Sequence, residues 1–441
     1  MIEDRDRLAS SEARELALDC LETGIEAGHP RTVVREAVAL EGDALRVGDA
    51  AYDRREYEEI VVLGGGNAGA HVAVALEEIL GDRIDRGVVV TDDPVETDRV
   101  TVREGDHPVP SERGVDATRE LLETADAVDE DTLVLAAITG GGSALMPAPA
   151  GGVSLADLQS TTDGLLASGA DIHEINAVRK HLSALKGGQL ARRLAPGTVA
   201  SLVLSDVVGN DPSVIASGPV APDESTFEDA LAVLERYRID APDAVVDRLE
   251  RGTAGEIAET PSPDDPAFDT VSNHVVADGM TVLEAARETA ADRGYETLVL
   301  SSRVRGEARE AATTHVAVAE EALATGTPIS PPAVILSGGE TTVTVRGDGA
   351  GGPNQEFATS AALALENGGR ITVAAVDTDG IDGATDAAGA LVDGATVADP
   401  DDARVALAEN DVYPYLASRD ALLLTGPTGT NLNDLRVLVV R

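Results

Sequence analysis

The chain has 441 residues, of which 79 are acidic and 34 are basic, so its formal net charge at pH 7 is −45. A surface with so much negative charge repels nucleic acid and anionic membranes, which excludes both as general partners. Because self-repulsion destabilises a compact chain unless salt screens it, the composition predicts a halophilic protein.

Length, cysteine usage and hydropathy bound the class of protein further. A chain of this length predicts two domains, since single cores stop growing near about 300 residues. The single cysteine, Cys20, excludes an internal disulfide. The N-terminus MIEDRDRLAS lacks the basic and apolar regions of a signal peptide, and no apolar run approaches about 18 residues. We therefore expect a cytoplasmic protein without a membrane-spanning helix.

Short apolar runs rich in β-branched residues alternate with helical patterns along the whole chain. The runs end in Gly, Ser or Asp, which is typical of parallel strands covered on both faces. The pattern predicts an α/β fold, with a doubly wound, Rossmann-like and mainly parallel sheet in the first domain and a second, smaller α/β domain. The expected strands lie within residues 59–66, 86–93, 132–142, 199–207, 296–302, 332–340, 370–380 and 436–441.

The segment 251–279 is the best candidate for the domain boundary. It contains proline, small residues and acids, but its periodicity is weak. We expect a first domain at 1–255 and a second at 265–441, with a last strand that could return to either sheet.

A glycine turn follows the first of these strands. Gly64, Gly66 and Gly69 satisfy G-x-G-x-x-G, a turn that lets amides and a helix N-terminus approach a phosphate or carboxylate. Asp92 and Asp93 close the next strand and could bind the ribose of a dinucleotide, as in a dehydrogenase. The alternative is a tight turn that serves only strand-to-helix packing.

Gly140, Gly141, Gly142 and Ser143 form a second glycine turn, at the end of the strand within 132–142. Consecutive glycines let successive amides converge on an anion, and the serine hydroxyl adds a donor. A loop without a ligand is the alternative, but two such turns in one domain favour anion binding.

The chain has two lysines, Lys180 and Lys186, in the segment INAVRKHLSALKGG at residues 175–188. On a helix, Arg179, Ser183 and Lys186 share one stripe, and Lys180 lies nearby. Exposed helix faces elsewhere in this chain are acidic, so a cationic stripe predicts binding of an anionic ligand. A structural salt bridge is the alternative.

Ser205 and Asp206 lie at the end of the strand within 199–207, just before a turn. An aspartate at a strand end can hold Mg²⁺ or take a proton from a substrate hydroxyl, although ordinary turn aspartates are common in so acidic a chain. His107 lies in a proline-rich loop and suits a structural role as well as substrate contact. No pair of histidines has the H-E-x-x-H spacing, which argues against a catalytic zinc.

Two polar turns stand out in the second half of the chain. Asn354, Gln355 and Glu356 end a glycine-rich turn, and Asp379 belongs to a cluster of aspartates and glycines at 377–386. The aspartate spacing misses the EF-hand pattern, so calcium is not expected by that route.

Eight sequence blocks, in this order, resemble the class II glycerate kinases (glycerate 2-kinases of the DUF4147 plus MOFRL type). The resemblance runs from about residue 10 to 441 and marks the chain as similar to a haloarchaeal-type acidic member. It implies transfer of the γ-phosphoryl group of ATP, with Mg²⁺, to the 2-hydroxyl of D-glycerate, giving 2-phosphoglycerate in a cleft between two α/β domains. The blocks are EGDHPVPSERG, ITGGGSAL, INAVRKHLSALKGGQLA, LSDVVGNDPSVIASGP, LSGGETTVTV, GGPNQEFA, DTDGIDGATDAAGALVD and TGPTGTNLND.

The resemblance also implies roles for the residues singled out above. Phosphoryl transfer needs cations and amides around developing phosphate charge more than covalent chemistry from the protein. Arg179, Lys180 and Lys186 are then expected to bind negative charge, and Asp206 to hold Mg²⁺ or take the hydroxyl proton. The implied substrate- and phosphate-binding residues are Gly64, Gly65, Gly66, Gly140, Gly141, Gly142, Ser143, Ser205, Asn354, Gln355, Glu356 and Asp379.

The sequence departs from the family pattern at two positions. Asn67, a catalytic candidate by position, stands where the family usually has an active-site lysine, and Pro353 stands where it commonly has arginine. Either other cations of this chain, Arg346 among them, replace these two, or the substrate has changed, or activity is lost.

Two other classes of function stay open at this point. One is an NAD-dependent oxidoreductase built on the first glycine turn, and the other is a hydroxy-acid or nucleotide-binding protein without turnover. For the kinase, the expected partners are D-glycerate and a nucleotide, and a homodimer is compatible with the sequence.

Overall fold

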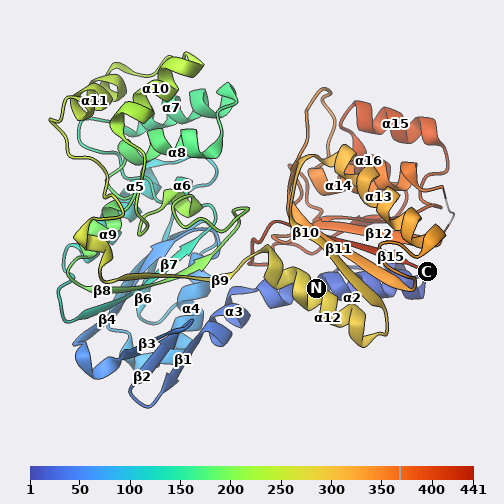
Figure 1. Ribbon diagram of the computed structural model, residues 1–441, viewed down its shortest axis with the longest axis horizontal. Helices are drawn as coiled ribbons and strands as arrows, with labels where there is room; N and C mark the ends of the chain where they lie inside the picture. The colour runs from blue at the N-terminus through green and yellow to red at the C-terminus, as the bar shows by residue number, and fades with distance from the viewer. Residues whose placement is uncertain (367–368) are drawn as a thin grey trace. The chain divides into compact units, whose positions relative to one another are not determined.

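The computed structural model describes residues 1–366 and 369–441, which fold into two compact units (Figure 1). The central unit is Val33–Val276. The terminal unit combines the two ends of the chain, Met1–Thr32 and Ala277–Arg441. The prediction of two α/β domains is confirmed, and each unit has its own six-stranded sheet.

The units differ from the predicted division into 1–255 and 265–441 at both ends of the central unit. The helix α2 (Glu12–Gly28) belongs to the terminal unit, because its apolar face packs against that unit's strand β15 (Asp434–Val440) and helix α12 (Gly279–Asp292). At the other end, strand β9 (Val271–Ala277) adds an edge to the central sheet, so the proline-rich segment before it lies within the central unit.

The central sheet has the strand order β6-β5-β4-β7-β8-β9, and neighbours from β6 to β8 are all parallel. This order, with β4 in the middle and crossovers on either side, confirms the doubly wound, Rossmann-like prediction. A small antiparallel sheet precedes it. The central strands are β4 (Glu59–Gly65), β5 (Arg86–Thr91), β6 (Val100–Glu104), β7 (Thr132–Thr139) and β8 (Thr198–Leu204), and the small sheet is β1 (Val38–Glu41), β2 (Ala44–Val47) and β3 (Ala50–Asp53).

Some helices of the central unit cover the two faces of its sheet, and others pack against one another in a separate apolar cluster. The bounds are α3 (Pro30–Ala37, across the division between the units), η1 (Arg54–Glu56), α4 (Gly69–Leu80), η2 (Gly81–Arg83), α5 (Glu112–Ala125), α6 (Gly142–Leu145), α7 (Leu155–Ser168), α8 (Ile172–His181), α9 (Gln189–Leu194), η3 (Ile215–Ser217), α10 (Phe227–Tyr237), α11 (Asp243–Thr253) and η4 (Pro266–Phe268).

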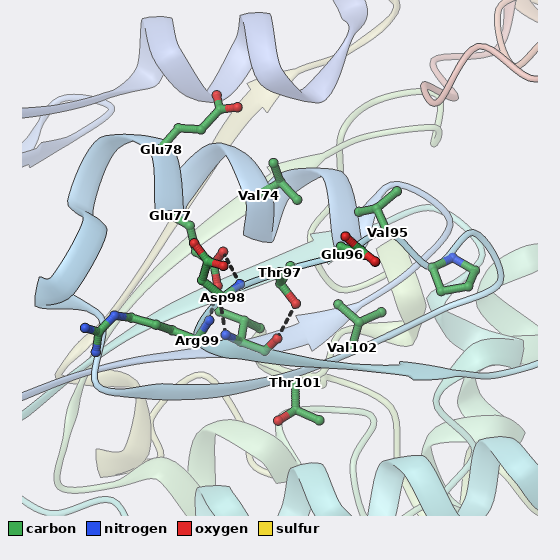
Figure 2. A pocket seen from close by; sticks show the side chains of 12 residues that line it. Val74, Glu77, Glu78, Val95, Glu96, Thr97, Asp98, Arg99, Thr101 and Val102 are labelled. Atoms are coloured by element: carbon green, nitrogen blue, oxygen red, sulfur yellow. Dashed lines mark hydrogen bonds between the residues drawn. The ribbon is translucent and has the colours of Figure 1, made fainter.

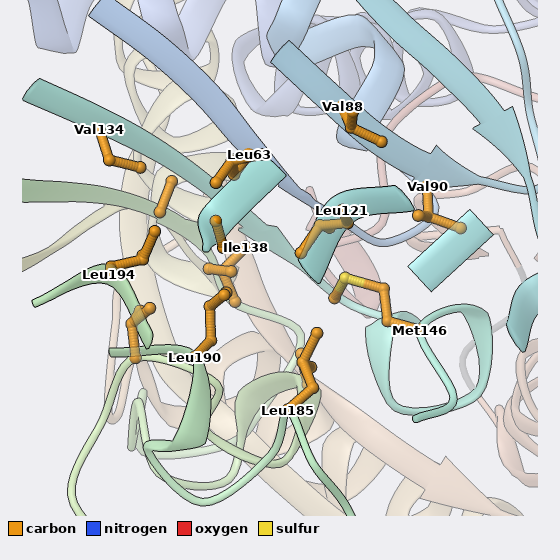
Figure 3. Close-up of a cluster of buried hydrophobic side chains, with 14 of the residues drawn as sticks. Leu63, Val88, Val90, Leu121, Val134, Ile138, Met146, Leu185, Leu190 and Leu194 are labelled. Carbon is orange, nitrogen blue, oxygen red and sulfur yellow. The ribbon is translucent and has the colours of Figure 1, made fainter. Parts of the chain in front are cut away.

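The core of the central unit follows from the alternation of side chains along each strand. Val134 and Ile138 of β7 lie in one cluster with Leu121 of α5 and with Leu190 and Leu194 of α9 (Figure 3). The intervening residues of β7 face the other side, where α4 packs on β4, β5 and β7. Both faces are therefore buried, which is why these strands read as continuous apolar runs.

The terminal sheet is mixed, with the order β10-β11-β15-β12-β13-β14. Only the β10 and β11 pair is parallel among the strand pairs of its described residues. The last strand, β15, lies between β11 and β12, so it stays in this unit. The remaining bounds are β10 (Glu296–Glu307), β11 (Ala333–Thr342), β12 (Ile371–Asp377), β13 (Gly389–Asp393), β14 (Leu422–Leu423), α1 (Arg5–Leu8), α13 (Ala308–Thr325), α14 (Pro353–Ala364), α15 (Pro400–Ala408) and α16 (Val412–Ala417).

Candidate functional site

Three of the predicted loops meet at one edge of the central sheet. The strands β4, β7 and β8 are parallel neighbours, so their carboxyl ends lie together. A Cβ atom added to Gly140 would lie 2.1 Å from the Asp206 carboxylate, and one added to Gly141 would lie 1.9 Å from Oδ1 of Asn67. The structure thus brings together three separate candidates of the sequence analysis, namely Asn67, the second glycine turn and Asp206.

The amides of the first glycine turn are already bonded within the protein. The amides of Gly66 and Asn67 donate to the carbonyls of Val90 (3.0 Å) and Gly140 (2.8 Å). The Ala68 amide donates to Oγ1 of Thr139 at 3.3 Å. These amides are therefore not free to bind a phosphate in this conformation, and the packing alternative accounts for the turn.

The acids that follow β5 are also engaged near this turn. Nδ2 of Asn67 donates to Asp92 at 2.8 Å, and Asp93 lies 2.9 Å from Nε2 of His71. The Oδ1 atom of Asn67 is buried and has no hydrogen-bond partner in the described part of the chain. These side chains form a polar cluster at the sheet edge.

A cavity of about 290 Å³ opens beside the second glycine turn, entirely within the central unit. Four segments build it: the loop at 107–110, the turn around α6, the helix α7, and α8 with the residues that follow it. The lining residues are His107, Pro108, Pro110, Gly141, Ser143, Ala144, Pro147, Leu158, Thr162, Leu166, Arg179, Ser183 and Lys186.

The segment that carries the cations folds differently from the single helix expected. The helix α8 begins with a capping box formed by Asp171 and Glu174 and ends at His181. Beyond it, Oγ of Ser183 accepts hydrogen bonds from the amides of Leu185 and Lys186, both at 3.1 Å, and forms a turn. This local side-chain bonding competes with the helix and ends it early.

Arg179 and Lys186 nevertheless line the same cavity. The Lys186 ammonium, 5% exposed, donates to the Met146 carbonyl at 2.9 Å. Neither cation pairs with a carboxylate in the described ranges 1–366 and 369–441. Burial lowers the pKa of the Arg179 guanidinium. The pKa of Lys186 falls to about 7, mainly because the ammonium is buried and also because the charge of Arg179 is near. The arrangement is an uncompensated positive site that an anion would stabilise.

Lys180 lies elsewhere. Its ammonium donates to Asp223 at 3.1 Å, and both side chains are nearly inaccessible to solvent. The other oxygen of this carboxylate accepts a hydrogen bond from Thr260 at 2.9 Å. Lys180 lines a different cavity of about 520 Å³ and is absent from the lining of the first. It forms the structural salt bridge that was the alternative for this segment.

A chain of buried hydrogen bonds leads away from the second glycine turn. The hydroxyls of Ser143 and Ser217 are 2.7 Å apart, and the Ser217 hydroxyl donates to Oδ1 of Asn176 at 3.0 Å. Ala216 and Ser217 both have positive φ angles, of 51° and 60°. The sequence analysis missed Ser217 and Asn176, since one polar residue in an apolar segment is a weak signal.

Ser205, the predicted neighbour of Asp206, has a local role in the structure. Its Oγ atom accepts from the Val207 amide at 3.3 Å and donates to the Val207 carbonyl at 3.2 Å. These bonds shape the turn after β8 and thereby set the position of Asp206.

A third cavity of the central unit, about 960 Å³, is lined by residues of α4, of the loop 94–99 and of β6, and contains none of the predicted site residues (Figure 2). The Glu77 carboxylate accepts hydrogen bonds from the amides of Asp98, Arg99 and Val100 at 2.7–2.8 Å. Glu77 therefore fixes the loop before β6, and this role in the fold accounts for its position in the cavity.

The predicted residues of the second half belong to the terminal unit, where they form a buried network. The amides of Asn354 and Gln355 donate to the two Asp382 oxygens at 2.9 and 2.8 Å. Glu356 accepts from Arg309 and from Asn410, each at 2.7 Å. Because burial outweighs these bonds, the pKa of Asp382 rises to about 7. The network holds the start of α14.

Asp379 lies near this network, in the turn after β12. Its carboxylate accepts from the Ile381 amide at 2.7 Å, and its carbonyl accepts from the Thr428 amide at 3.0 Å. Asp434 was missed by the sequence analysis, although it accepts from Nδ2 of Asn354 at 2.6 Å and pairs with the fully buried Arg436.

In residues 1–366 and 369–441, no group of three or more His, Cys, Asp or Glu side chains is arranged to hold a metal ion. No helix in these ranges is long and apolar enough to cross a membrane.

Comparison with known proteins adds the family. Residues 16–250 match the family described as "Domain of unknown function (DUF4147)", and residues 333–434 match the MOFRL family. The chain is 39% identical to the D-glycerate 2-kinase of Thermotoga maritima over 96% of this chain and 97% of that protein. The chain belongs to the glycerate 2-kinase family.

A solved structure supports the glycerate 2-kinase fold over the whole length. The crystal structure of a glycerate kinase from Thermotoga maritima has a TM-score of 0.83 and 38% identity, and the match covers 97% of this chain and 99% of that one. A protein of Agrobacterium vitis that is provisionally named a hydroxypyruvate reductase is 41% identical over 86% of this chain and 99% of its own length. The relatives thus carry names from two classes of enzyme.

The two departures from the glycerate kinase pattern have structural consequences. Asn67 is tied to Asp92, so this position contributes an amide and no charge. Pro353 is the first residue of α14, a position that suits proline because the amide there has no partner inside the helix. The cavity cations of the central unit are Arg179 and Lys186.

Proposed function

We propose that this chain is an ATP- and Mg²⁺-dependent kinase that phosphorylates the 2-hydroxyl of D-glycerate to 2-phosphoglycerate. The observation that carries the proposal is that Arg179 and Lys186 line one cavity and that neither has a carboxylate partner in the described ranges. The chain as a whole has a net charge of −45. Two cations without a carboxylate partner in the described ranges, Lys186 buried and Arg179 partly buried, indicate an anionic ligand in so acidic a protein. The names of the glycerate kinase relatives supply the identity of that ligand.

The cavity suits the acceptor better than the nucleotide. Its volume of about 290 Å³ lies at the small end of ligand pockets, which are typically about 300–1,000 Å³. In the proposed complex, the glycerate carboxylate lies between the Arg179 guanidinium and the Lys186 ammonium, beside the turn that contains Gly141 and Ser143. Fixing the acceptor in this way supplies the positioning that phosphoryl transfer needs.

The transfer itself forms one bond and breaks one. The 2-hydroxyl oxygen bonds to the γ-phosphorus of ATP, the bond from that phosphorus to the bridging oxygen breaks, and ADP leaves with the electron pair. In the proposed mechanism Asp206 takes the hydroxyl proton; this role is supported by the contact of its carboxylate with Gly140, whose neighbour Gly141 lines the cavity.

One carboxylate of the proposed site suits a bound magnesium ion. Mg²⁺ usually keeps several waters and uses one or two carboxylates together with substrate phosphates, so a preformed cluster of protein ligands is not required. Asp206 is the carboxylate that would hold it, because the glycine at 140 leaves room for that side chain at the edge of the sheet. When bound, Mg²⁺ neutralises phosphate charge during transfer.

The oxidoreductase alternative requires the first glycine turn to bind a pyrophosphate. The amides of Gly66, Asn67 and Ala68 are instead bonded to other parts of the protein. The kinase therefore accounts for more of the site, although a relative carries a reductase name.

The proposed function is tested by ³¹P NMR of the protein with MgATP and D-glycerate in molar KCl. The expected result is ADP together with a resonance that matches 2-phosphoglycerate, and loss of that resonance in R179M/K186M. Folded protein that gives no phosphorylated product, or that oxidises D-glycerate when NAD is supplied, would overturn the proposal.

A further inference from the structure

The cavity next to the second glycine turn has both charged and apolar residues in its lining. Arg179 and Lys186 contribute positive charge to the lining, and proline and leucine side chains such as Pro108 and Leu158 contribute apolar surface. His107 and Thr162 line the same cavity, and no hydrogen bond of either side chain to another described residue is found. These two groups are therefore available to a ligand.

The loop that carries His107 is fixed on both sides of the histidine. The Asp106 carboxylate pairs with Arg113 at 2.5 Å on the side of α5. On the other side, Nε2 of Gln159 in α7 donates to the Pro110 carbonyl at 2.7 Å. The backbone position of the histidine is thus set before a ligand arrives, while its ring remains exposed at the cavity.

The proposed acceptor leaves one polar group without a partner in this cavity. Its carboxylate is matched by Arg179 and Lys186, and its 2-hydroxyl must stay open to the phosphoryl donor. The 3-hydroxyl remains, and a group next to an apolar wall loses free energy if its hydrogen bonds to water are not replaced. An imidazole can both donate and accept a hydrogen bond, as a hydroxyl can.

We infer that His107 is the specificity-determining residue that binds the 3-hydroxyl of the acceptor. The inference rests on the proposed function and deepens it. It assigns to His107 the discrimination between D-glycerate and 2-hydroxy acids that lack the second hydroxyl. The ring binds the acceptor's tail and takes no part in the transfer of the phosphoryl group.

The test compares D-glycerate with D-lactate, which differs from it only by the absent 3-hydroxyl. We expect His107→Leu to lower kcat/KM for D-glycerate about tenfold, the effect of one exposed hydrogen bond, and to leave kcat/KM for D-lactate unchanged or raised. His107→Asn, which keeps a donor and an acceptor, restores part of the preference. His173→Leu is the matched control, since it makes the same change at another exposed histidine outside this cavity.

The outcomes separate this inference from the proposed function. Equal losses for both acids in His107→Leu would show a structural role and overturn the inference while leaving the kinase intact. Loss of the preference in Thr162→Val with His107→Leu unaffected would assign the 3-hydroxyl to the other free group and also overturn it. If the wild-type protein phosphorylates neither acid, the proposed function itself fails.

Discussion

Lys180 and Lys186 are both buried in one short segment, yet their ammonium groups have different partners. The first is neutralised by the Asp223 carboxylate, which is itself 3% exposed. The second has a backbone carbonyl and a nearby arginine, so its charge is not compensated by the protein. One lysine is therefore expected to support the fold and the other to support ligand binding.

Replacing each lysine by methionine separates these roles. Lys180→Met leaves a buried carboxylate without its cation, and we expect the free energy of unfolding to fall by about 3–5 kcal/mol. Lys186→Met removes a buried charge, so we expect unchanged or higher stability and a loss of kcat/KM for D-glycerate of about 100-fold. Denaturant unfolding and steady-state kinetics on both variants check this pair.

An exchange of the two phenotypes would contradict the assignment. The same would hold if Lys186→Met lost stability and activity in parallel, because that result indicates a structural lysine.

The pKa of Lys186, lowered to about 7, also predicts a pH dependence. The protonated ammonium binds the carboxylate, and its population falls as the pH rises through about 7. We therefore expect the KM for D-glycerate to rise about tenfold for each pH unit above that pKa when binding requires the charge. The profile is measured from about pH 6 to about pH 9.

Lys186→Arg is the control for this profile, since arginine stays protonated throughout the range. Its KM should be nearly flat with pH. A variant that keeps the wild-type slope would assign the titration to another group of the protein and contradict the role of Lys186.

At the residue scale, the sequence indicated which cations are unusual, but it did not indicate which groups they contact. Arg179 and Lys186 stood out because cations are scarce in this chain, and they share a cavity. The partner of Lys180 could not be predicted, since Asp223 is one of 79 acids and only the tertiary fold brings it close.

At the scale of elements, the first glycine turn is explained by the close approach of two strands. Gly64 has a φ of 140°, and a Cβ atom there would lie 2.0 Å from the Ala137 carbonyl oxygen in β7. No other residue fits such a position without moving the sheet. The motif is therefore needed for packing whether or not a ligand binds.

Gly64→Ala tests this explanation. A positive φ costs a non-glycine residue about 1–2 kcal/mol, and the clash with β7 adds to it, so we expect unfolding to become easier by about 3 kcal/mol or more. Gly42→Ala is the matched control, because Gly42 has a φ of 66° but nothing within 4 Å of the added atom. It should cost about 1 kcal/mol.

Denaturant unfolding of both variants gives the comparison. Equal losses of stability would show that the backbone angle alone decides, and would remove the argument for close packing at Gly64.

Strand positions were predictable because buried parallel strands read as apolar runs, as in β4 and β7. Helix ends were less predictable. The α8 helix stops at His181 because the Ser183 hydroxyl bonds the following amides, and the apolar spacing continues past that point. Periodicity reports the buried face of a segment, and side-chain bonding decides where the helix ends.

At the scale of the whole molecule, the order of segments along the chain did not indicate which segments belong to which unit. The apolar stripe of α2 predicts a helix but does not say which sheet it covers, and the structure places it in the terminal unit. Similarly, β9 follows a proline-rich segment that resembles a linker. A cytoplasmic location and a homodimer stay predictions from the sequence.

The net charge of −45 predicts that salt stabilises the protein. The Debye length falls from about 10 Å at 0.1 M salt to about 3 Å at 1 M, so repulsion between surface carboxylates is screened over this range. We expect the unfolding temperature to rise by about 2–4 °C for each kcal/mol of repulsion removed. Calorimetry between 0.1 and 3 M KCl measures the effect.

The shape of that curve provides the control. Screening predicts a rise that is steep below about 1 M and then levels off. A rise that is linear throughout would indicate exclusion of the salt from the protein surface, and a flat curve would contradict the prediction.

The central claim is that the Arg179–Lys186 cavity binds the acceptor, and a crystal structure of the protein with D-glycerate tests it most directly. The account predicts density for one molecule in this cavity, with its carboxylate within hydrogen-bond distance of both cations and its 2-hydroxyl toward the side of Asp206. D-glycerate bound at the first glycine turn or beside Lys180, with the Arg179–Lys186 cavity empty, would contradict it.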